Sequence, residues 1–219
     1  MSMRITALQS QVNDPDRISV FVNDRFLLGM STLIVLQMGL RINQEVTPAL
    51  LQEMEQAEAL QKAVDRTLNY LASRPHSREE VRRYLRQKQT PPELIDPVLE
   101  RLDRLNLLND ESFASFWIES RGRFHPKGAQ ALKSELKMKG VDSEVIDEMV
   151  TGEQDEELAL EAGRKKALSL FRQPDLDFNT FRGRLGPFLQ RRGFSYSVTK
   201  HAVQTLWQEH TDEPAEEDF

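Results

Sequence analysis

The chain has 219 residues, a net charge of −6, 39% hydrophobic and 29% charged residues, and only ten glycines and ten prolines. This composition is typical of a soluble, helix-rich protein, and the negative charge argues against a protein that coats nucleic acid through bulk electrostatics. The absence of cysteine excludes disulfides, thiolate metal sites and cysteine nucleophiles, and it fits a reducing cytoplasm.

The sequence shows no segment suited to a membrane. Its first residues lack the apolar core of a signal peptide. The longest uncharged stretch lies between Arg25 and Arg41, is interrupted by glycines, and falls short of the roughly 20 residues that span a bilayer. We therefore expect a cytoplasmic protein with no membrane partner.

A small β segment is expected within residues 1–46, because apolar and polar residues alternate there with period two. Strands are predicted at residues 4–9, 17–22 and 25–28, with turns at 13–16 and 23–24. Ser31 is placed to cap a short helix that ends at Gly39. So short a β unit would be marginal alone, and we expect it to pack on the first long helix.

From Thr47 onward the apolar spacing changes to three and four, which is typical of helices, and the pattern repeats. Residues 81–95, 132–146 and 185–199 align without gaps. The aligned leucines Leu85, Leu136 and Leu189 lie 51 and 53 residues apart. The same offsets relate Lys88, Lys139 and Arg192, and also Val98, Met149 and Ala202.

Each repeat divides into three helices. The first helices are predicted at about residues 56–73, 110–123 and 154–171, the middle helices carry the aligned leucines, and the third helices follow. Ser77–Glu80 and Thr90–Glu93 both match a capping box, and Gly140 and Gly193 stand where a middle helix would end in a left-handed residue. The predicted boundaries are a β segment at 1–46, three-helix repeats at 47–108, 109–152 and 153–210, and an acidic tail at 211–219.

The predicted fold is therefore mostly α, with three tandem three-helix repeats after the β segment. Repeats stacked in a row would form an elongated, curved body with a concave surface suited to a large partner. Charge is also divided along the chain. The segments 121–140 and 182–200 are basic, whereas 142–157 and the C-terminal tail are acidic.

Basic residues recur on or next to the middle helices. On one helix a charge run is usually a solvated face, but recurrence at matching offsets favours a shared binding face. Its target could be DNA phosphates or an acidic protein surface, and the sequence does not choose between them. The candidate filament- or DNA-binding residues are Arg82, Arg83, Arg86, Lys88, Arg121, Lys127, Lys133, Lys137, Lys139, Arg182, Arg184, Arg191 and Arg192.

No catalytic constellation is found. The aromatic residues at 113, 116 and 117 have helical spacing, which favours core packing over an exposed base-stacking platform. The acidic run 153–157 lies at a helix start, where carboxylates favour the positive end of the helix dipole more simply than they indicate a metal. The four histidines show no metal spacing, and residues 183–186 lack the lysine of a phosphate loop. We expect a non-enzymatic protein without cofactor or metal.

Two segments carry a resemblance to a known family. Residues 110–121 (DESFASFWIESR), followed by Lys127-Gly128 and by residues 132–141 (LKSELKMKGV), resemble the central signature of RecX proteins. Residues 71–81 (LASRPHSREEV) resemble the start of their first repeat. The order of a short β segment and three three-helix repeats is similar over nearly the whole chain.

The resemblance implies a regulator that binds the groove of a RecA-type recombinase filament on single-stranded DNA. It also implies that the protein inhibits ATP hydrolysis and strand exchange and has no activity of its own. We expect the protein to be a monomer. Two positions depart from the repeat pattern: Gln89 replaces a glycine in the first repeat, and Ser197 replaces a glutamate in the third. The alternative reading is a simple nucleic-acid-binding module whose basic helices follow phosphates.

Overall fold

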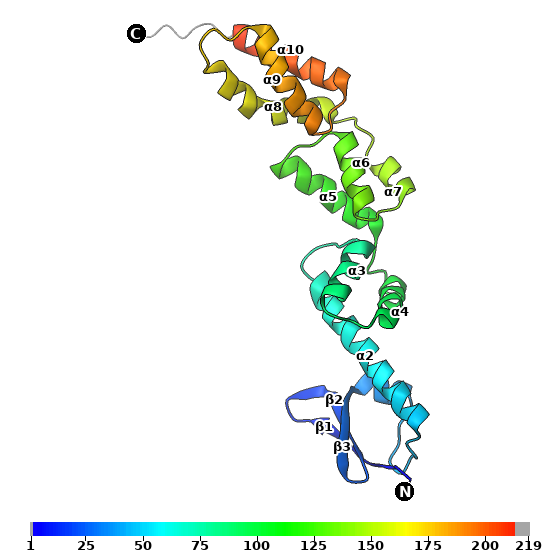
Figure 1. The fold of residues 1–219 in the computed structure, drawn as a ribbon. Helices are drawn as coiled ribbons and strands as arrows, with labels where there is room; N and C mark the ends of the chain where they lie inside the picture. The colour runs from blue at the N-terminus through cyan, green and yellow to red at the C-terminus, as the bar shows by residue number, and fades with distance from the viewer. Residues whose placement is uncertain (1, 213–219) are drawn as a thin grey trace. The chain divides into compact units, whose positions relative to one another are not determined.

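The computed structural model describes residues 2–212, and within this range three strands precede ten helices (Figure 1). The predicted acidic tail lies outside the described residues from position 213 onward. The chain divides into two compact units. Unit 1 comprises Met1–Arg74 and Val81–Leu107, and unit 2 comprises Pro75–Glu80 and Leu108–Phe219.

The strands β1 (Ile5–Gln11), β2 (Asp14–Val22) and β3 (Arg25–Ser31) form an antiparallel sheet in the order β1-β2-β3. Val20 pairs with Leu8 on one side and with Leu28 on the other, and it is completely buried. The predicted turn at 23–24 is confirmed, because both of its residues have the positive φ that a two-residue hairpin turn requires. The predicted turn at 13–16 is wrong, since Asp14 already pairs with Gln11 and leaves only residues 12–13 in the turn.

Two helices follow the sheet in unit 1. The short helix α1 (Thr32–Gln37) begins after Ser31 as predicted, although the Ser31 side chain makes no capping hydrogen bond, and Gly39 has a φ of 61°. The next helix, α2 (Pro48–Leu71), begins eight residues before the predicted position 56. The cause is local: the Thr47 side chain accepts a hydrogen bond from the Leu50 amide, and Pro48 suits the first turn of a helix.

The start of α2 holds the sheet, as expected for so small a β unit. Met54 of α2 is completely buried in one apolar cluster with Val20 and Met30. A polar link lies beside it: Glu58 accepts a hydrogen bond from Arg17 Nη2 at 2.6 Å and another from the Ser31 amide at 2.8 Å. The sheet and α2 therefore form one packed body.

The remaining helices of unit 1 are most of α3 (Arg78–Gln87) and all of α4 (Pro92–Arg104). Leu85 is completely buried, as the repeat alignment predicts. The Ser77 hydroxyl accepts a hydrogen bond from the Glu80 amide at 3.2 Å, which confirms its capping role at the start of α3. The capping box predicted at Thr90 is wrong. Pro91 takes the cap position of α4, and no side chain caps that helix.

Gln89 ends the middle helix of the first repeat with a φ of 56°, the left-handed conformation that glycine adopts in the other repeats. A side chain in this region costs about 1–2 kcal/mol, partly offset by the greater freedom that glycine has in the unfolded chain. We expect Gln89→Gly to stabilise the protein by about 0.5–1 kcal/mol in urea denaturation. Gln87→Gly, within the same helix, should destabilise it, and equal effects of the two substitutions would contradict this account.

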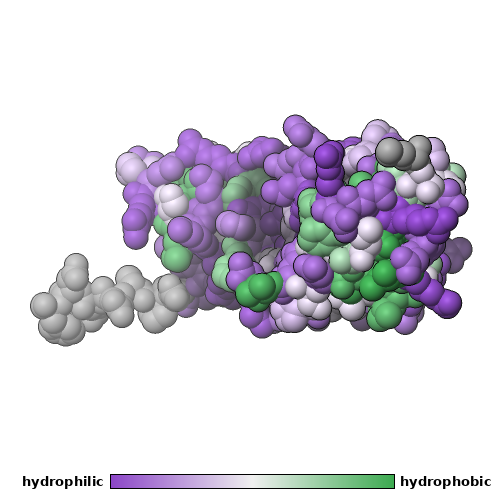
Figure 2. All heavy atoms as spheres, turned by 90° about the horizontal axis from the view of Figure 1, so that it is seen from below, coloured by the Kyte–Doolittle hydropathy of each residue, from purple (hydrophilic) through white to green (hydrophobic). Residues whose placement is uncertain are grey.

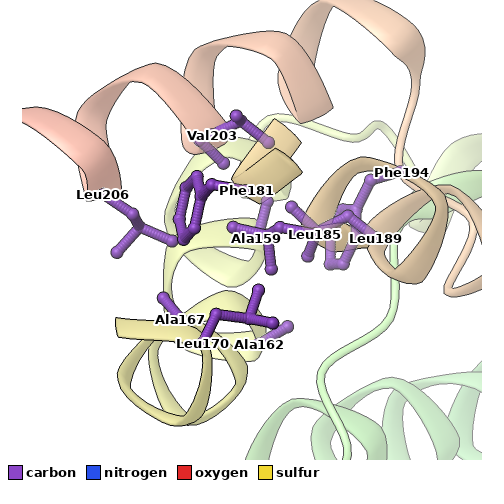
Figure 3. Close-up of a cluster of buried hydrophobic side chains, with 11 residues drawn as sticks. Ala159, Ala162, Ala167, Leu170, Phe181, Leu185, Leu189, Phe194, Val203 and Leu206 are labelled. Carbon is purple, nitrogen blue, oxygen red and sulfur yellow. The ribbon is translucent and has the colours of Figure 1, made fainter. Parts of the chain in front are cut away.

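Unit 2 contains six helices among the described residues, and its first helices begin within one residue of the predicted positions. They are α5 (Asp110–Phe124), α6 (Ala129–Met138), α7 (Ser143–Met149), α8 (Asp155–Phe171), α9 (Phe178–Arg191) and α10 (Tyr196–Asp212). Helices α5–α7 enclose a core that contains Phe113 and Leu136. Helices α8–α10 enclose a second core, in which Phe181 and Leu185 of α9 lie among the side chains of α8 and α10 (Figure 3).

Two glycines join the second and third repeats within unit 2. The Gly128 amide donates a hydrogen bond to the Arg192 carbonyl at 3.0 Å. A Cβ atom on Gly193 would lie 2.3 Å from the Cβ of Ala131, and one on Gly128 would lie 2.4 Å from the Gly193 carbonyl oxygen. Gly193 also has a φ of 86°. The start of α6 and the end of α9 therefore meet backbone to backbone, with no room for side chains.

Some large apolar side chains remain on the surface. Figure 2 shows hydrophobic residues between hydrophilic ones on the face seen from below. In unit 1 the exposed ones include Phe26, Leu36 and Ile42. None of the helices between residues 2 and 212 has the length and apolar character needed to cross a membrane.

Candidate functional site

The predicted binding residues lie on or directly after the middle helices, with two exceptions. Arg121 belongs to α5, and Lys127 lies in the loop between α5 and α6. The residues of the first repeat belong to unit 1 and all the others to unit 2. The residues on or directly after α3 are Arg82, Arg83, Arg86 and Lys88. Those on or directly after α6 are Lys133, Lys137 and Lys139, and those on or directly after α9 are Arg182, Arg184, Arg191 and Arg192.

Glu135, the one acid of the basic segment 121–140, gathers three donors. Its Oε2 accepts hydrogen bonds from Trp117 Nε1 and from Arg121 Nε, both at 2.9 Å, and its Oε1 accepts one from Lys127 Nζ. The side chain of Glu135 is 15% exposed. Two of the predicted binding residues therefore neutralise a half-buried carboxylate.

The surroundings of Glu135 act on its pKa in two directions. Burial alone would raise the pKa, but the hydrogen bonds from Lys127, Arg121 and Trp117 outweigh that effect, so the pKa lies below its ordinary value of 4.5. A carboxyl whose pKa is lowered by folding stabilises the folded state above its unfolded pKa, and this contribution is lost as the pH falls through the folded pKa.

We therefore expect Glu135→Gln to lower the free energy of unfolding at pH 7. The difference between the variant and the wild type should shrink as the pH falls below the ordinary value of 4.5, because wild-type Glu135 then becomes neutral as well. Urea denaturation at pH 7 and in acid measures both quantities. Glu119→Gln is the control, because the Glu119–Arg123 pair is 61% and 70% exposed and should contribute little. A difference independent of pH would contradict the ionic role.

Lys139 is held by contacts on two sides. Its Nζ lies 2.6 Å from Glu80 Oε1 and 4.6 Å from the centre of the Trp117 ring. The Arg121 guanidinium lies 4.4 Å from the same ring. The Lys139 carbonyl also accepts a hydrogen bond from the Ser77 hydroxyl at 2.7 Å. Trp117 thus lies close to two cations, and the contacts fix the end of α6.

Two further predicted residues form exposed ion pairs. Lys133 Nζ lies 2.6 Å from Asp147 Oδ1, and Arg82 Nη1 lies 2.8 Å from Asp96 Oδ1. The two aspartates are 73% and 65% exposed, so solvent screens both pairs.

Arg86 and Lys137 occupy the same position in the aligned middle helices α3 and α6. Both are exposed, and within residues 2–212 neither forms an ion pair. The third repeat has Gln190 at this position, but the next residue, Arg191, is exposed and unpaired within the same range. An exposed base without a carboxylate partner in this range therefore recurs at one position in two repeats, and one residue later in the third.

The bases of α9 contact neutral groups instead of carboxylates. The Arg192 guanidinium lies 4.6 Å from the centre of the Phe188 ring, and its Nη1 donates a hydrogen bond to the Pro126 carbonyl. Arg184 donates a hydrogen bond to the Gln173 side chain. Within residues 2–212, neither Arg184 nor Arg192 is therefore paired with a carboxylate.

Three bases that the repeat pattern did not identify lie close to Arg192. Arg123 of α5 and the pair Lys165 and Lys166 of α8 line a cavity of about 560 Å³ together with Arg192. The pattern of the middle helices could not indicate them, because all three lie on first helices. The signal of Lys165 and Lys166 was the double lysine itself, which stands out on a helix that begins with acids, and Arg123 belongs to the basic segment 121–140.

The acidic run at the start of α8 has a structural role. Asp155 is 8% exposed, and its carboxylate accepts hydrogen bonds from the Ala129 amide, at the beginning of α6, at 3.0 and 3.1 Å. Burial raises the pKa of Asp155, and the hydrogen bond from Ala129 opposes that shift. In the part of the chain that the structure describes, no group of three or more acidic or histidine side chains could hold a metal ion.

Comparison with protein families matches four consecutive regions. Residues 3–47 match the regulatory protein RecX N-terminal domain, and residues 63–102, 109–150 and 153–203 match the first, second and third three-helix domains of RecX. The four matches follow each other in the order that the strands and helices have in the structure.

Curated relatives and solved structures agree. The regulatory protein RecX of Bacillus pumilus is 27% identical over 97% of this chain and 81% of its own length, and that of Bacillus subtilis is 26% identical over the same shares. A crystal structure of regulatory protein RecX superposes with a TM-score of 0.78 at 23% identity, covering 92% of this chain and 99% of that one. The RecX of Lactobacillus salivarius gives a TM-score of 0.59 at 25% identity, over 68% and 97%. The chain therefore belongs to the RecX family of regulatory proteins.

Proposed function

We propose that this protein binds a RecA-type recombinase filament on single-stranded DNA and inhibits its ATP hydrolysis and strand exchange. It acts in the cytoplasm as a monomer, with no catalytic activity. The division into repeats at 47–108, 109–152 and 153–210 is part of this proposal, because each repeat would present its middle helix to the filament.

The observation that carries the proposal is the equivalence of Arg86 and Lys137. Both are exposed bases at one position of two aligned helices, and neither is paired with a carboxylate among the described residues. Bases repeated at a fixed interval suit a partner that is itself repetitive, such as a filament of identical subunits. The family membership supports the same partner.

ATP hydrolysis by a recombinase on single-stranded DNA, with this protein titrated in, tests the proposal. We expect the rate to fall at less than one copy per recombinase monomer, because a ligand that contacts successive subunits blocks several at once. An unchanged rate of ATP hydrolysis with this protein in excess would refute the proposed regulatory role.

A pair of charge-matched variants tests the surface. Arg86→Glu/Lys137→Glu should need a much higher concentration than the wild type for the same inhibition. Arg25→Glu/Arg41→Glu changes the net charge equally in the β segment and its following loop, and it should inhibit like the wild type. Equal inhibition by the two double variants would mean that Arg86 and Lys137 do not take part in binding.

A further inference from the structure

Two neighbouring cavities of unit 2 concentrate positive charge. The first, of about 560 Å³, lies between the end of α5 and the helices α8 and α9, and the second, of about 450 Å³, lies between α8 and α9. Lys166 and Phe188 line both, so the cavities adjoin. Together they are lined by six lysines and arginines, Arg123, Lys165, Lys166, Arg184, Arg191 and Arg192, against one acid, Glu161.

Among the described residues, five of these six bases have no carboxylate partner, unlike those around Glu135. Lys165, Lys166 and Arg191 form no ion pair within the described part of the chain. Arg123 pairs with Glu119, but the pair is largely exposed and therefore weak. Because the cavities bring together charges that repel one another in the free protein, they favour an anion with several charges.

The aromatic residues indicate which kind of anion. Phe124 lines the first cavity, and its side chain is 72% exposed, so its ring is accessible to a ligand. Phe188, half-buried, lines both cavities, and the Arg192 guanidinium lies 4.6 Å from the centre of its ring. Bases beside an exposed aromatic ring suit single-stranded nucleic acid, whose phosphates pair with cations and whose unpaired bases stack. An acidic peptide would use the cations but would leave Phe124 without a role.

We propose that these cavities form a binding site for single-stranded nucleic acid. The strand's phosphates would lie along Lys165, Lys166 and Arg191, and one base would stack on Phe124. The site deepens the proposed function and rests on it for its biological setting, a filament that carries single-stranded DNA. It does not include Arg86 or Lys137, because it is centred on first-helix residues of the third repeat.

Fluorescence anisotropy of a labelled oligothymidylate, without recombinase, tests the site. Lys165→Glu/Lys166→Glu should bind at least about 10-fold more weakly than the wild type and show a shallower dependence on salt, because contacts with phosphates are lost. Arg25→Glu/Arg41→Glu has the same net charge and should lose far less. Urea denaturation checks that both variants are folded. Equal affinities of the two folded variants would overturn the proposal.

A second arm tests the base contact. Phe124→Ala should weaken binding of oligothymidylate but not of an abasic strand of the same length, because only stacking depends on the base. Equal losses on both strands would overturn the stacking assignment. Polyglutamate and unlabelled oligothymidylate are compared as competitors of the labelled oligonucleotide. If polyglutamate displaced it at lower concentrations, the assignment of nucleic acid as the ligand would be overturned, and an acidic protein segment would be indicated instead. Since recombinase is absent throughout, a failed ATPase assay and a failed oligonucleotide assay are separate results.

Discussion

Gly193→Ala is expected to destabilise the protein by about 2–5 kcal/mol. Gly193 has a φ of 86°, where a side chain costs about 1–2 kcal/mol. The added methyl would also lie 2.3 Å from the Ala131 Cβ, and overpacking of this kind costs about 1–3 kcal/mol more. The methyl meets backbone atoms of α6 as well, so no rotamer change relieves the contact. Urea denaturation of the purified variant measures the loss.

Gly183→Ala provides the control for this substitution. Gly183 lies on the exposed face of α9, and a Cβ atom there would meet nothing within 4 Å. Because alanine favours helix over glycine, this variant should be stabilised by up to about 1 kcal/mol. Similar free energies of unfolding for the two variants would mean that the close contact between the second and third repeats does not exist in solution.

Leu136→Ala is expected to cost about 2–5 kcal/mol, because the side chain is completely buried and its removal leaves a cavity. Leu136 packs with Phe113 of α5 and Ile146 of α7 in one core. The loss should appear as a lower urea midpoint with an unchanged slope, since the fold of the variant is the same.

Met138→Ala is the comparison for Leu136→Ala within the same helix. Met138 is 69% exposed, so its replacement should change stability by no more than about 0.5 kcal/mol. If Leu136→Ala cost less than about 1 kcal/mol, the alignment that places Leu136 with Leu85 and Leu189 would be wrong.

The repeated part of the fold could be predicted because its signals are local and occur three times. Leu85, Leu136 and Leu189 are all completely buried, as their common position in the alignment requires. The left-handed ends at Gly140 and Gly193 are confirmed as well. The same conformation at Gln89 shows that the helix geometry outweighs the preference of the residue itself.

Details decided by competing local signals could not be predicted as reliably. At the start of α4, Thr90 and Glu93 have the spacing of a capping box, but the two prolines between them fix the backbone so that Pro91 stands at the cap. At the start of α2, the predicted position 56 leaves out the local signal of Thr47 and Pro48. Thr47 caps the helix and Pro48 suits its first turn, so the helix begins at Pro48 and its first turns pack on the sheet.

The contacts within the candidate site could not be predicted from the sequence for a different reason. Sequence patterns identified the bases but not their partners, because these come from other elements. Glu135 counts as a single acid among bases in the sequence, yet the fold brings Arg121 and Lys127 to it. Asp155 is an acidic residue at a helix start, yet its carboxylate also accepts a hydrogen bond from the Ala129 amide at the start of α6, 26 positions earlier. Contacts of this kind depend on how the helices pack.

The contacts of Trp117 give the protein an optical reporter. The chain has two tryptophans, and Trp207→Phe would leave Trp117 as the only tryptophan, while keeping an aromatic ring against Phe171 and Phe181. The emission energy of an indole responds to charges beside its ring, and Lys139 lies 4.6 Å from the ring of Trp117. A polyanion that drew Lys139 away would shift the emission, so partner binding at the end of α6 could be followed in real time without a label.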